Sequence, residues 1–262
     1  METHVLASGS TGNAIFLDFG KTKLLIDAGI SARRIKNALD SLGVAIEDLD
    51  AVLITHEHRD HVSGLRTLMH KYRLPVYARQ AAWAAMPGLA DLPPAYRCVM
   101  PESLYIGEVL IKPFSISHDA SDPVGYTFYC RGTKCTIATD LGFVTDTVKQ
   151  ALALSDVLVL EANHDAEMLR TGSYPWHLKR RIMSNRGHLS NVDAAWALAR
   201  MERKRRTHVF LAHLSQENNR PDIAKSTISA ILTEQGLKIG EEIELHLTYP
   251  DTVASLVGLT GE

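Results

Sequence analysis

The chain has 262 residues, 45% of them hydrophobic, which is enough to build the core of one large domain or two small ones. Its formal net charge of -2 excludes a globally basic nucleic-acid-binding protein but leaves room for a local basic face. The three cysteines are an odd number without a CxxC spacing, which argues against a disulfide framework.

The N-terminal segment METHVLASGS has no basic region followed by an apolar stretch, and no apolar run approaches the ~18 residues of a membrane span. We therefore expect a soluble, cytoplasmic protein without a membrane association. The proline-rich segment 86–103 is predicted to be a long surface loop, because strand and helix patterns continue on both sides of it. We predict a single domain over residues 1–262.

Five short runs rich in Val, Ile and Leu recur along the chain, and each ends in ionisable residues. Each has the length and β-branched content of a buried strand. Because an unpaired charge is costly to bury, the five strand ends are expected to converge on one polar site. The runs are KLLID ending at Asp27, AVLITHEH ending in a histidine cluster, KCTIATD ending at Asp140, DVLVLEA ending around Glu161, and HVFLAH ending at His213.

Helix patterns alternate with these runs, at 31–42, 61–72, 145–154 and 190–205. The last begins at Ser190, with Asp193 three positions on as in a capping box. Segments 109–116 and 124–130 alternate like antiparallel strands. This order predicts an α/β (α+β) sandwich of mixed sheets with helices outside, and not a Rossmann repeat.

The segment LITHEHRDH at 53–61 concentrates three histidines and two acids directly after an apolar run. It is not the helical H-E-x-x-H motif, because Asp60 stands where the second histidine belongs. On an extended backbone His56 and His58 point to the same side. Asp60 and His61 are expected in the first turn of the next helix, facing the same pocket from the other side. This arrangement supplies two ligands to each of two adjacent metals; a polar loop that happens to be rich in histidine is the alternative.

The motif THEHRDH resembles the signature of the metallo-β-lactamase superfamily, and its other motifs also occur in order, in LLIDAG, SISHDA, IATDLG and LAHLS. The resemblance implies a four-layer αβ/βα sandwich with two divalent metal ions. Asp140 would bridge the two ions, and Asp27 would orient ligands from behind them. The implied ligands are His56, His58 and His118 for one ion and Asp60, His61 and His213 for the other.

All these ligands are imidazoles or carboxylates, which suits Mn²⁺ or Zn²⁺ without deciding between them. Two such ions about 3.5–4 Å apart can activate a hydroxide and stabilise both the attacking and the leaving oxygen of an ester. An aspartate at position 140 is typical of the phosphodiesterase and thioesterase branches of the superfamily. It therefore counts against β-lactam hydrolysis as the main activity.

Two further motifs are similar to those of tRNase Z-like nucleases. LEANHD places Glu161 at a strand end, and GHLSN places His188 just before a helix. In those nucleases such a pair assists protonation of the leaving group, which phosphodiester cleavage needs because an alkoxide leaves poorly. We assign catalytic roles to Glu161 and His188, together with Asp60. A local hydrogen-bonding role for His188 at the start of the helix is the alternative.

Residues 177–206 contain nine Lys or Arg against two acids, a marked asymmetry in a chain of net charge -2. Phosphate backbones attract such surfaces. The basic residues at 203–206 fit a solvated helix end. Those nearest to His188 in the sequence are better candidates for substrate contacts: Lys179, Arg180, Arg181 and Arg186.

The turn ASGSTGN at 7–13 has small residues and backbone donors suited to a phosphate. Together with EANHD, YPWHLKRRI, GHLSN and HLSQENN, it resembles the YycJ/WalJ group of bacterial exonucleases, which act on DNA in the 5′ to 3′ direction. The resemblance runs essentially from end to end. It implies substrate contacts from Ser8, Ser10, Asn13, Asn218 and Asn219.

The spacing of the ligands is short. Between His118 and Asp140 there is no room for the tRNA-gripping arm of long tRNase Z enzymes, and between Asp140 and His213 none for a β-CASP cap. We expect a dinuclear metal-dependent phosphodiesterase, specifically a 5′→3′ exodeoxyribonuclease with a role in DNA repair, acting on DNA ends that carry a 5′-phosphate. The alternatives are a ribonuclease, a small or cyclic phosphodiesterase or a thioesterase of the same fold, and a catalytically silent nucleic-acid-binding relative.

Overall fold

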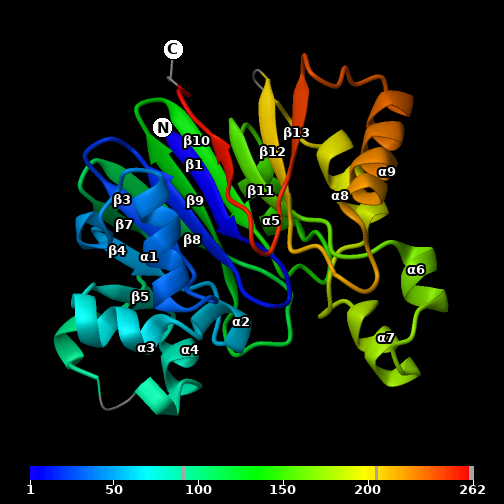
Figure 1. The fold of residues 1–262 in the computed structure, drawn as a ribbon. Coiled ribbons are helices and arrows are strands. Elements are labelled where there is room, and N and C mark those ends of the chain that lie inside the picture. The colour runs from blue at the N-terminus through cyan, green and yellow to red at the C-terminus, as the bar shows by residue number, and fades with distance from the viewer. Residues whose placement is uncertain (90–91, 204–205, 260–262) are drawn as a thin grey trace.

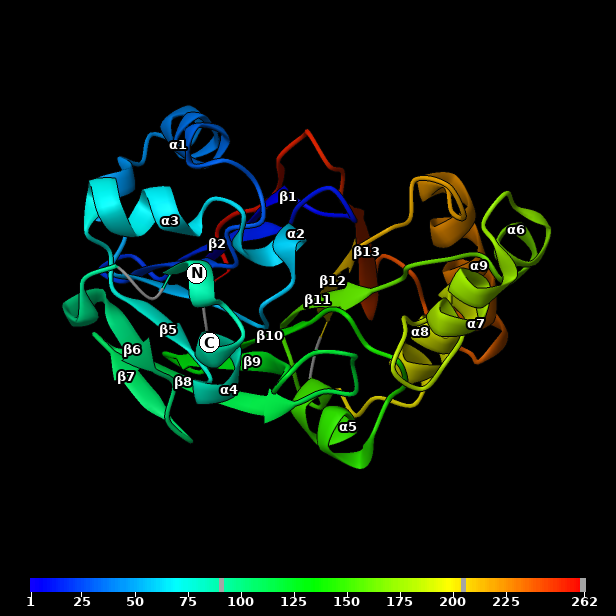
Figure 2. The ribbon, with the colours of Figure 1, turned by 90° about the horizontal axis from the view of Figure 1, so that it is seen from below.

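A computed structural model describes residues 1–89, 92–203 and 206–259. In this part of the chain two seven-stranded sheets pack face to face, and helices cover their outer faces (Figures 1 and 2). The predicted mixed-sheet sandwich with outer helices is confirmed.

The two sheets share one plan, in which an antiparallel half continues into a parallel half. The first sheet runs in the order β14 (Ala254–Leu256), β1 (Glu2–Ala7), β2 (Ala14–Asp18), β3 (Lys23–Ile26), β4 (Ala51–Leu53), β5 (Val76–Ala78), β6 (Arg97–Val99). The second runs in the order β13 (Ile243–Leu247), β12 (Thr207–Ala212), β11 (Val157–Glu161), β10 (Thr133–Ala138), β9 (Val124–Cys130), β8 (Val109–Ser115), β7 (Leu104–Ile106).

Three layers of apolar side chains hold the sandwich together. The middle layer lies between the sheets and contains alternate residues of β9, Val124, Tyr126 and Phe128, as the period of two requires. The hydroxyl of Tyr126 is buried there and donates to the carbonyl of Ile54 at 2.7 Å. This hydrogen bond joins the second sheet to the segment after β4 of the first and satisfies the buried donor.

The outer layers lie under the helices. Ile35 and Leu39 of α1 pack on the first sheet, and Ala195 and Leu198 of α8 pack on the second. The helices beside the first sheet are α1 (Ala32–Ser41), α2 (Arg59–Val62), α3 (Leu65–Thr67) and α4 (Gln80–Ala84), with the helical turns η1 (Ile46–Asp48), η2 (Leu68–Tyr72), η3 (Pro87–Leu89) and η4 (Pro94–Tyr96). Those beside the second are α5 (Asp146–Leu152), α6 (Ala166–Thr171), α7 (Trp176–Ile182), α8 (Asn191–Ala199) and α9 (Pro221–Glu234).

The continuous helix predicted over 61–72 is wrong. The chain there forms α2, α3 and the π-helical turn η2 in succession. Tertiary contacts divert the helical hydrogen bonds: the amide of Gly64 donates to Ala28, and the carbonyl of Asp60 accepts from the amide of Asn13, both at 2.8 Å. The amphipathic pattern could not reveal these backbone partners.

Two further boundaries differ from the prediction. The helix predicted over 190–205 ends at Ala199, and positions 204 and 205 lie outside the described residues. The segment 86–103 is not simply a surface loop, because it contains β6, which pairs with β5, and because Met86 and Leu89 are buried in the outer core of the first sheet. Positions 90 and 91 of this segment also lie outside the described residues.

None of the helices in the described ranges combines the length and the apolar character that crossing a lipid bilayer requires.

Candidate metal centre

The structure brings the predicted strand ends together at one edge of the sandwich. Asp27 follows β3, and the histidine cluster follows β4 of the same sheet. From the second sheet come Asp140 after β10, Glu161 at the end of β11 and His213 after β12. These strands belong to the parallel half of each sheet or border it, so their carboxyl ends point to the same edge.

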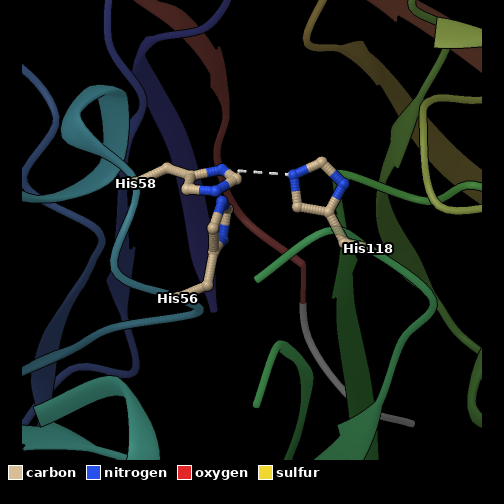
Figure 3. A group of neighbouring side chains, drawn as sticks. All are labelled: His56, His58 and His118. Carbon is tan, nitrogen blue, oxygen red and sulfur yellow. Dashed lines mark hydrogen bonds between the residues drawn. The ribbon is translucent and has the colours of Figure 1, made fainter. Parts of the chain in front are cut away.

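One group of ligand atoms belongs to His56, His58 and His118, which all lie within 4.8 Å of one another. Figure 3 shows the three imidazoles with their nitrogens converging from two different loops. The Nδ1 of His58 lies 3.3 Å from the Nε2 of His118. The Nε2 of His56 is buried and has no hydrogen-bond partner.

A second group consists of Asp60, His61 and His213, with the same 4.8 Å limit. The Oδ2 of Asp60 lies 3.6 Å from the Nε2 of His61 and 3.5 Å from the Nε2 of His213. Asp140 lies between the two groups. Its carboxylate oxygens are 3.2 Å from His61 Nε2 and 3.8 Å from His118 Nε2.

The residues fit a pair of divalent cations. The Nε2 atoms of His56 and His213 and the Oδ2 of Asp140 are buried without a hydrogen-bond partner in the described structure. Buried polar atoms of this kind are costly unless something neutralises them. Imidazole and carboxylate donors, with no thiolate among them, suit Zn²⁺ or Mn²⁺.

Asp27 and Thr55 fix the orientation of the ligand loop from behind. The Oδ2 of Asp27 accepts a hydrogen bond from His61 Nδ1 at 2.7 Å, which turns the Nε2 of His61 toward the centre. The amide and hydroxyl of Thr55 both donate to Asp27, and the Thr55 hydroxyl lies 3.0 Å from Nδ1 of His56. Thr55 was not singled out from the sequence, although it stands directly before His56 in the motif.

The backbone at three of these positions is left-handed. Asp27, Asp140 and His213 have φ angles of 60°, 59° and 56°. Each follows directly or by one residue on a strand, so the chain turns sharply where the side chain must face the centre. The ligand loop is also closely packed: a Cβ atom at Gly29 would lie 1.6 Å from the carbonyl oxygen of Asp60.

Glu161 connects the centre to His188. Its Oε1 lies 2.8 Å from Nδ1 of His188 and 2.8 Å from Nδ1 of His213. Its Oε2 accepts from the amides of Leu141 and Leu189 at 2.7 and 3.1 Å. Glu161 is fully buried, whereas the side chain of His188 is 18% exposed and therefore reaches the solvent-facing side of the centre.

Both central carboxylates remain ionised in this environment. Burial opposes the charge on Asp140, but the facing imidazoles of His213 and His61 hold its pKa well below the usual value. Burial likewise opposes the charge on Glu161, but His188 and His213 lower its pKa to about 2. Two buried negative charges among imidazoles make an environment that attracts cations.

The candidate substrate residues fall into buried and exposed sets. Ser8 accepts from the amide of His213 at 2.7 Å, and Asn13 bonds to Gly9 and lies 3.2 Å from Nε2 of His61. Asn219 donates to the carbonyl of Ala162. These contacts tie loops to the metal centre. Asn218 is buried with both side-chain polar atoms unpartnered, whereas Ser10 is exposed.

The basic residues divide in the same way. Lys179 is only 8% exposed, and its ammonium donates to the carbonyls of Arg170 and Gly172. Arg180 and Arg186 are exposed. Sequence reasoning missed Asp119, which lies beside the centre; its position directly after His118 was the only available signal.

A family model described as "Beta-lactamase superfamily domain" matches residues 22–213. The chain therefore belongs to the metallo-β-lactamase superfamily, as its motifs predicted. It is 41% identical over 249 residues to the exodeoxyribonuclease YycJ of Bacillus anthracis, with 94% of each chain covered. It is 40% identical over 257 residues to the exodeoxyribonuclease WalJ of Streptococcus pneumoniae, with 96% of each chain covered.

Among solved structures, the chain superposes on the metallo-β-lactamase fold protein YhfI of Bacillus subtilis with a TM-score of 0.71. The superposition covers 97% of this chain and 98% of YhfI at 15% identity, so it speaks for the fold alone. The resemblance of the sequence to the YycJ/WalJ group is confirmed by the relatives in B. anthracis and S. pneumoniae.

Proposed function

We propose that this protein is a dinuclear metal-dependent 5′→3′ exodeoxyribonuclease that acts on DNA ends carrying a 5′-phosphate and serves in DNA repair. The observation that carries the proposal is the His188–Glu161 pair, 2.8 Å apart, beside two groups of ligand atoms that face the carboxylate of Asp140. An ester hydrolase of this superfamily that cleaves a phosphodiester needs such an acid for its poor leaving group. The two exodeoxyribonuclease relatives support DNA as the substrate.

The residues that would hold the metal ions are the two groups described above, with Asp140 shared between them. When bound, two divalent ions generate a nucleophile from water at neutral pH and neutralise charge on the phosphate. Asp60 would also act in the chemistry, since its carboxylate is 27% exposed while the other ligands of its group are buried.

Glu161 sets the proton positions around the site. Its charged Oε1 keeps a proton on Nδ1 of both His188 and His213. His213 then presents a lone pair on Nε2 to the metal group. His188, when protonated on both nitrogens, presents its Nε2 proton to the leaving 3′-oxygen of the terminal nucleotide. The buried amides on Oε2 hold Glu161 in place while this proton moves.

Substrate contacts would come from the exposed residues around the centre. Ser10 in the turn at 7–13, together with Arg180 and Arg186, can reach solvent and offer donors to phosphates. The buried residues Ser8, Asn13, Lys179, Asn218 and Asn219 would act by shaping the walls of the site.

The experiment uses four 3′-end-labelled oligonucleotides, DNA and RNA, each with a 5′-phosphate or a 5′-hydroxyl, incubated with the Mn²⁺-loaded protein. Progressive shortening of the labelled 5′-phosphorylated DNA, one nucleotide at a time from its 5′ end, is the expected result. Preferential cleavage of RNA, or internal cuts, would contradict the proposal and move the protein to the ribonuclease branch. Inertness toward all four would refute the nuclease assignment.

A further inference from the structure

The basic residues near His188 differ in their relation to the metal centre, and Arg181 stands apart from the rest. Lys179 is turned inward, whereas Arg181 lies on the surface at the C-terminal end of α7, with its side chain 55% exposed. Its Nε donates to the Oδ2 of Asp119 at 2.6 Å. Asp119 is the residue after His118, so this ion pair links the basic helix to a metal-binding group.

The segment that follows Arg181 is fixed to the loop around His118 at three points. Besides the Arg181–Asp119 pair, Ser117 donates to the carbonyl of Asn185 at 2.5 Å, and Nδ1 of His118 lies 3.2 Å from the carbonyl of Gly187. The segments around Gly142 and Asn185 also approach each other too closely for a side chain at position 142, where a Cβ would lie 2.1 Å from the Asn185 carbonyl. The position of Arg181 relative to the centre is therefore set by backbone contacts, and is not that of a free surface arginine.

Asp119 faces the centre with its other oxygen. Its Oδ1 lies 3.3 Å from Nε2 of His118 and is buried without a hydrogen-bond partner. One carboxylate thus contacts both the arginine and the edge of the metal-binding group.

The guanidinium of Arg181 retains free donors. Only its Nε is engaged, and among the described residues no hydrogen bond involves Nη1 or Nη2. Two parallel N–H donors beside residues that would hold divalent cations match the oxygens of a phosphate.

We propose that Arg181 forms a phosphate subsite of the bound strand, adjacent to the scissile phosphate, and that Asp119 is the positioning residue that aims its guanidinium. The ligand class is a phosphate of the nucleic-acid backbone, either the 5′-terminal group or the next internal one. This inference rests on the proposed function. An ordinary surface ion pair would contribute little to stability and nothing to DNA binding.

The experiment measures the anisotropy of 3′-fluorescein-labelled DNA with a 5′-phosphate or a 5′-hydroxyl on the metal-loaded protein. Phosphorothioate linkages slow cleavage during the measurement. The variants are Arg181→Gln, Arg181→Lys and Asp119→Asn. The matched control is Arg170→Gln, which removes an exposed arginine that is likewise paired with a carboxylate, that of Glu167. Metal content and thermal melting are recorded for every variant, so that misfolding is detected.

Arg181→Gln is expected to weaken binding about 10- to 100-fold, as the loss of charge-assisted hydrogen bonds implies. It should also reduce the slope of log K against log salt by about one. Arg181→Lys keeps the charge but lacks the planar guanidinium, so its affinity for DNA should lie between those of the wild type and Arg181→Gln. Asp119→Asn should raise KM more than it lowers kcat, with metal content unchanged, and the control should match the wild type.

The outcomes separate the two possible phosphates. A loss confined to the 5′-phosphorylated strand assigns the terminal phosphate, and an equal loss on both strands assigns the internal one. Binding by Arg181→Gln that equals that of the control would overturn the subsite while leaving nuclease activity of the wild type intact. A wild type that neither binds nor cleaves DNA would instead refute the proposed function, and the subsite with it.

Discussion

The two sheets contribute to the metal centre in different ways. The first sheet supplies one contiguous loop, residues 55–61, in which Asp27 orients His61 directly and His56 through Thr55. The second sheet supplies His118, Asp140, Glu161 and His213, which lie at or after the ends of four different strands. Its residues depend on one another across the sheet, through the bonds that converge on Glu161.

The two sheets are therefore expected to differ in how substitutions affect metal binding and activity. In the first sheet the Asp27–Thr55 pair orients two ligands, His56 and His61. Loss of this pair should therefore weaken metal binding by both ligands without removing either of them. In the second sheet each residue follows its own strand; Asp140 faces both metal groups, and Glu161 bonds to both His188 and His213. Substitutions in the second sheet are therefore expected to have larger and more specific effects.

The largest effect is expected for Asp140→Asn. The neutral amide replaces the carboxylate shared by the two metal groups, so the protein should bind at most one ion and lose at least about 1000-fold in nuclease activity. Metal analysis of the purified variant checks this result. Asp146→Asn, at an exposed carboxylate paired with Lys149, provides the control. Two ions retained by Asp140→Asn would show that this carboxylate does not bridge the two metal groups.

His188→Ala is expected to lower kcat by about 100-fold or more, because it removes the proton donor held by Glu161. Metal content should stay at the wild-type level if the ions are held by the two groups proposed above, His56–His58–His118 and Asp60–His61–His213. The imidazole of His188 also lies within 4.8 Å of ligand atoms of Asp140, Glu161 and His213, so the metal analysis tests this assignment directly. Steady-state kinetics and metal analysis on the same preparation test this. Parallel loss of metal and activity would mean that His188 is structural.

Gly29→Ala tests the packing of the ligand loop of the first sheet. The added Cβ would meet the carbonyl of Asp60 at 1.6 Å, so the free energy of unfolding should fall by about 2 kcal/mol or more. Urea denaturation of the metal-loaded protein measures the change. Gly88→Ala, where a Cβ meets nothing within 4 Å, should be close to neutral. Equal stability of the two variants would mean that the loop can move away from Gly29.

The smallest effect is expected for Thr55→Val, which removes the hydroxyl between Asp27 and His56 but keeps both residues. Metal affinity should fall about 10-fold, the lower limit for loss of a residue that orients ligands. Competition with a chelating dye gives this affinity. If Thr55→Val weakened metal binding as strongly as Asp140→Asn, the contrast between the two sheets would disappear.

The sequence predicted the sandwich, the five converging strand ends and the grouping of His56, His58 and His118, because each depends on local alternation and on residues next to a strand. It did not predict the interrupted helix after His61, since that break depends on backbone bonds to Ala28 and Asn13, which are distant in the sequence. The roles of the ligands and of His188 stay predictions until metal and activity are measured.

The basic stretch illustrates the same limit. From charge alone, Lys179 and Arg181 were equivalent candidates. Their environments differ because α7 turns Lys179 toward the carbonyls of Arg170 and Gly172 and presents Arg181 to Asp119. Composition gives the number of charges in a segment, but tertiary packing decides which of them face solvent.

The left-handed backbone at Asp27, Asp140 and His213 has a consequence for protein engineering. A non-glycine residue in this conformation costs about 1 kcal/mol relative to glycine. The native sequence is therefore less stable than it could be at three positions that carry candidate functional side chains. Screens that select only for resistance to heat would favour glycine there and would enrich inactive proteins. A stabilised form of this enzyme is better sought at positions distant from these three strand ends.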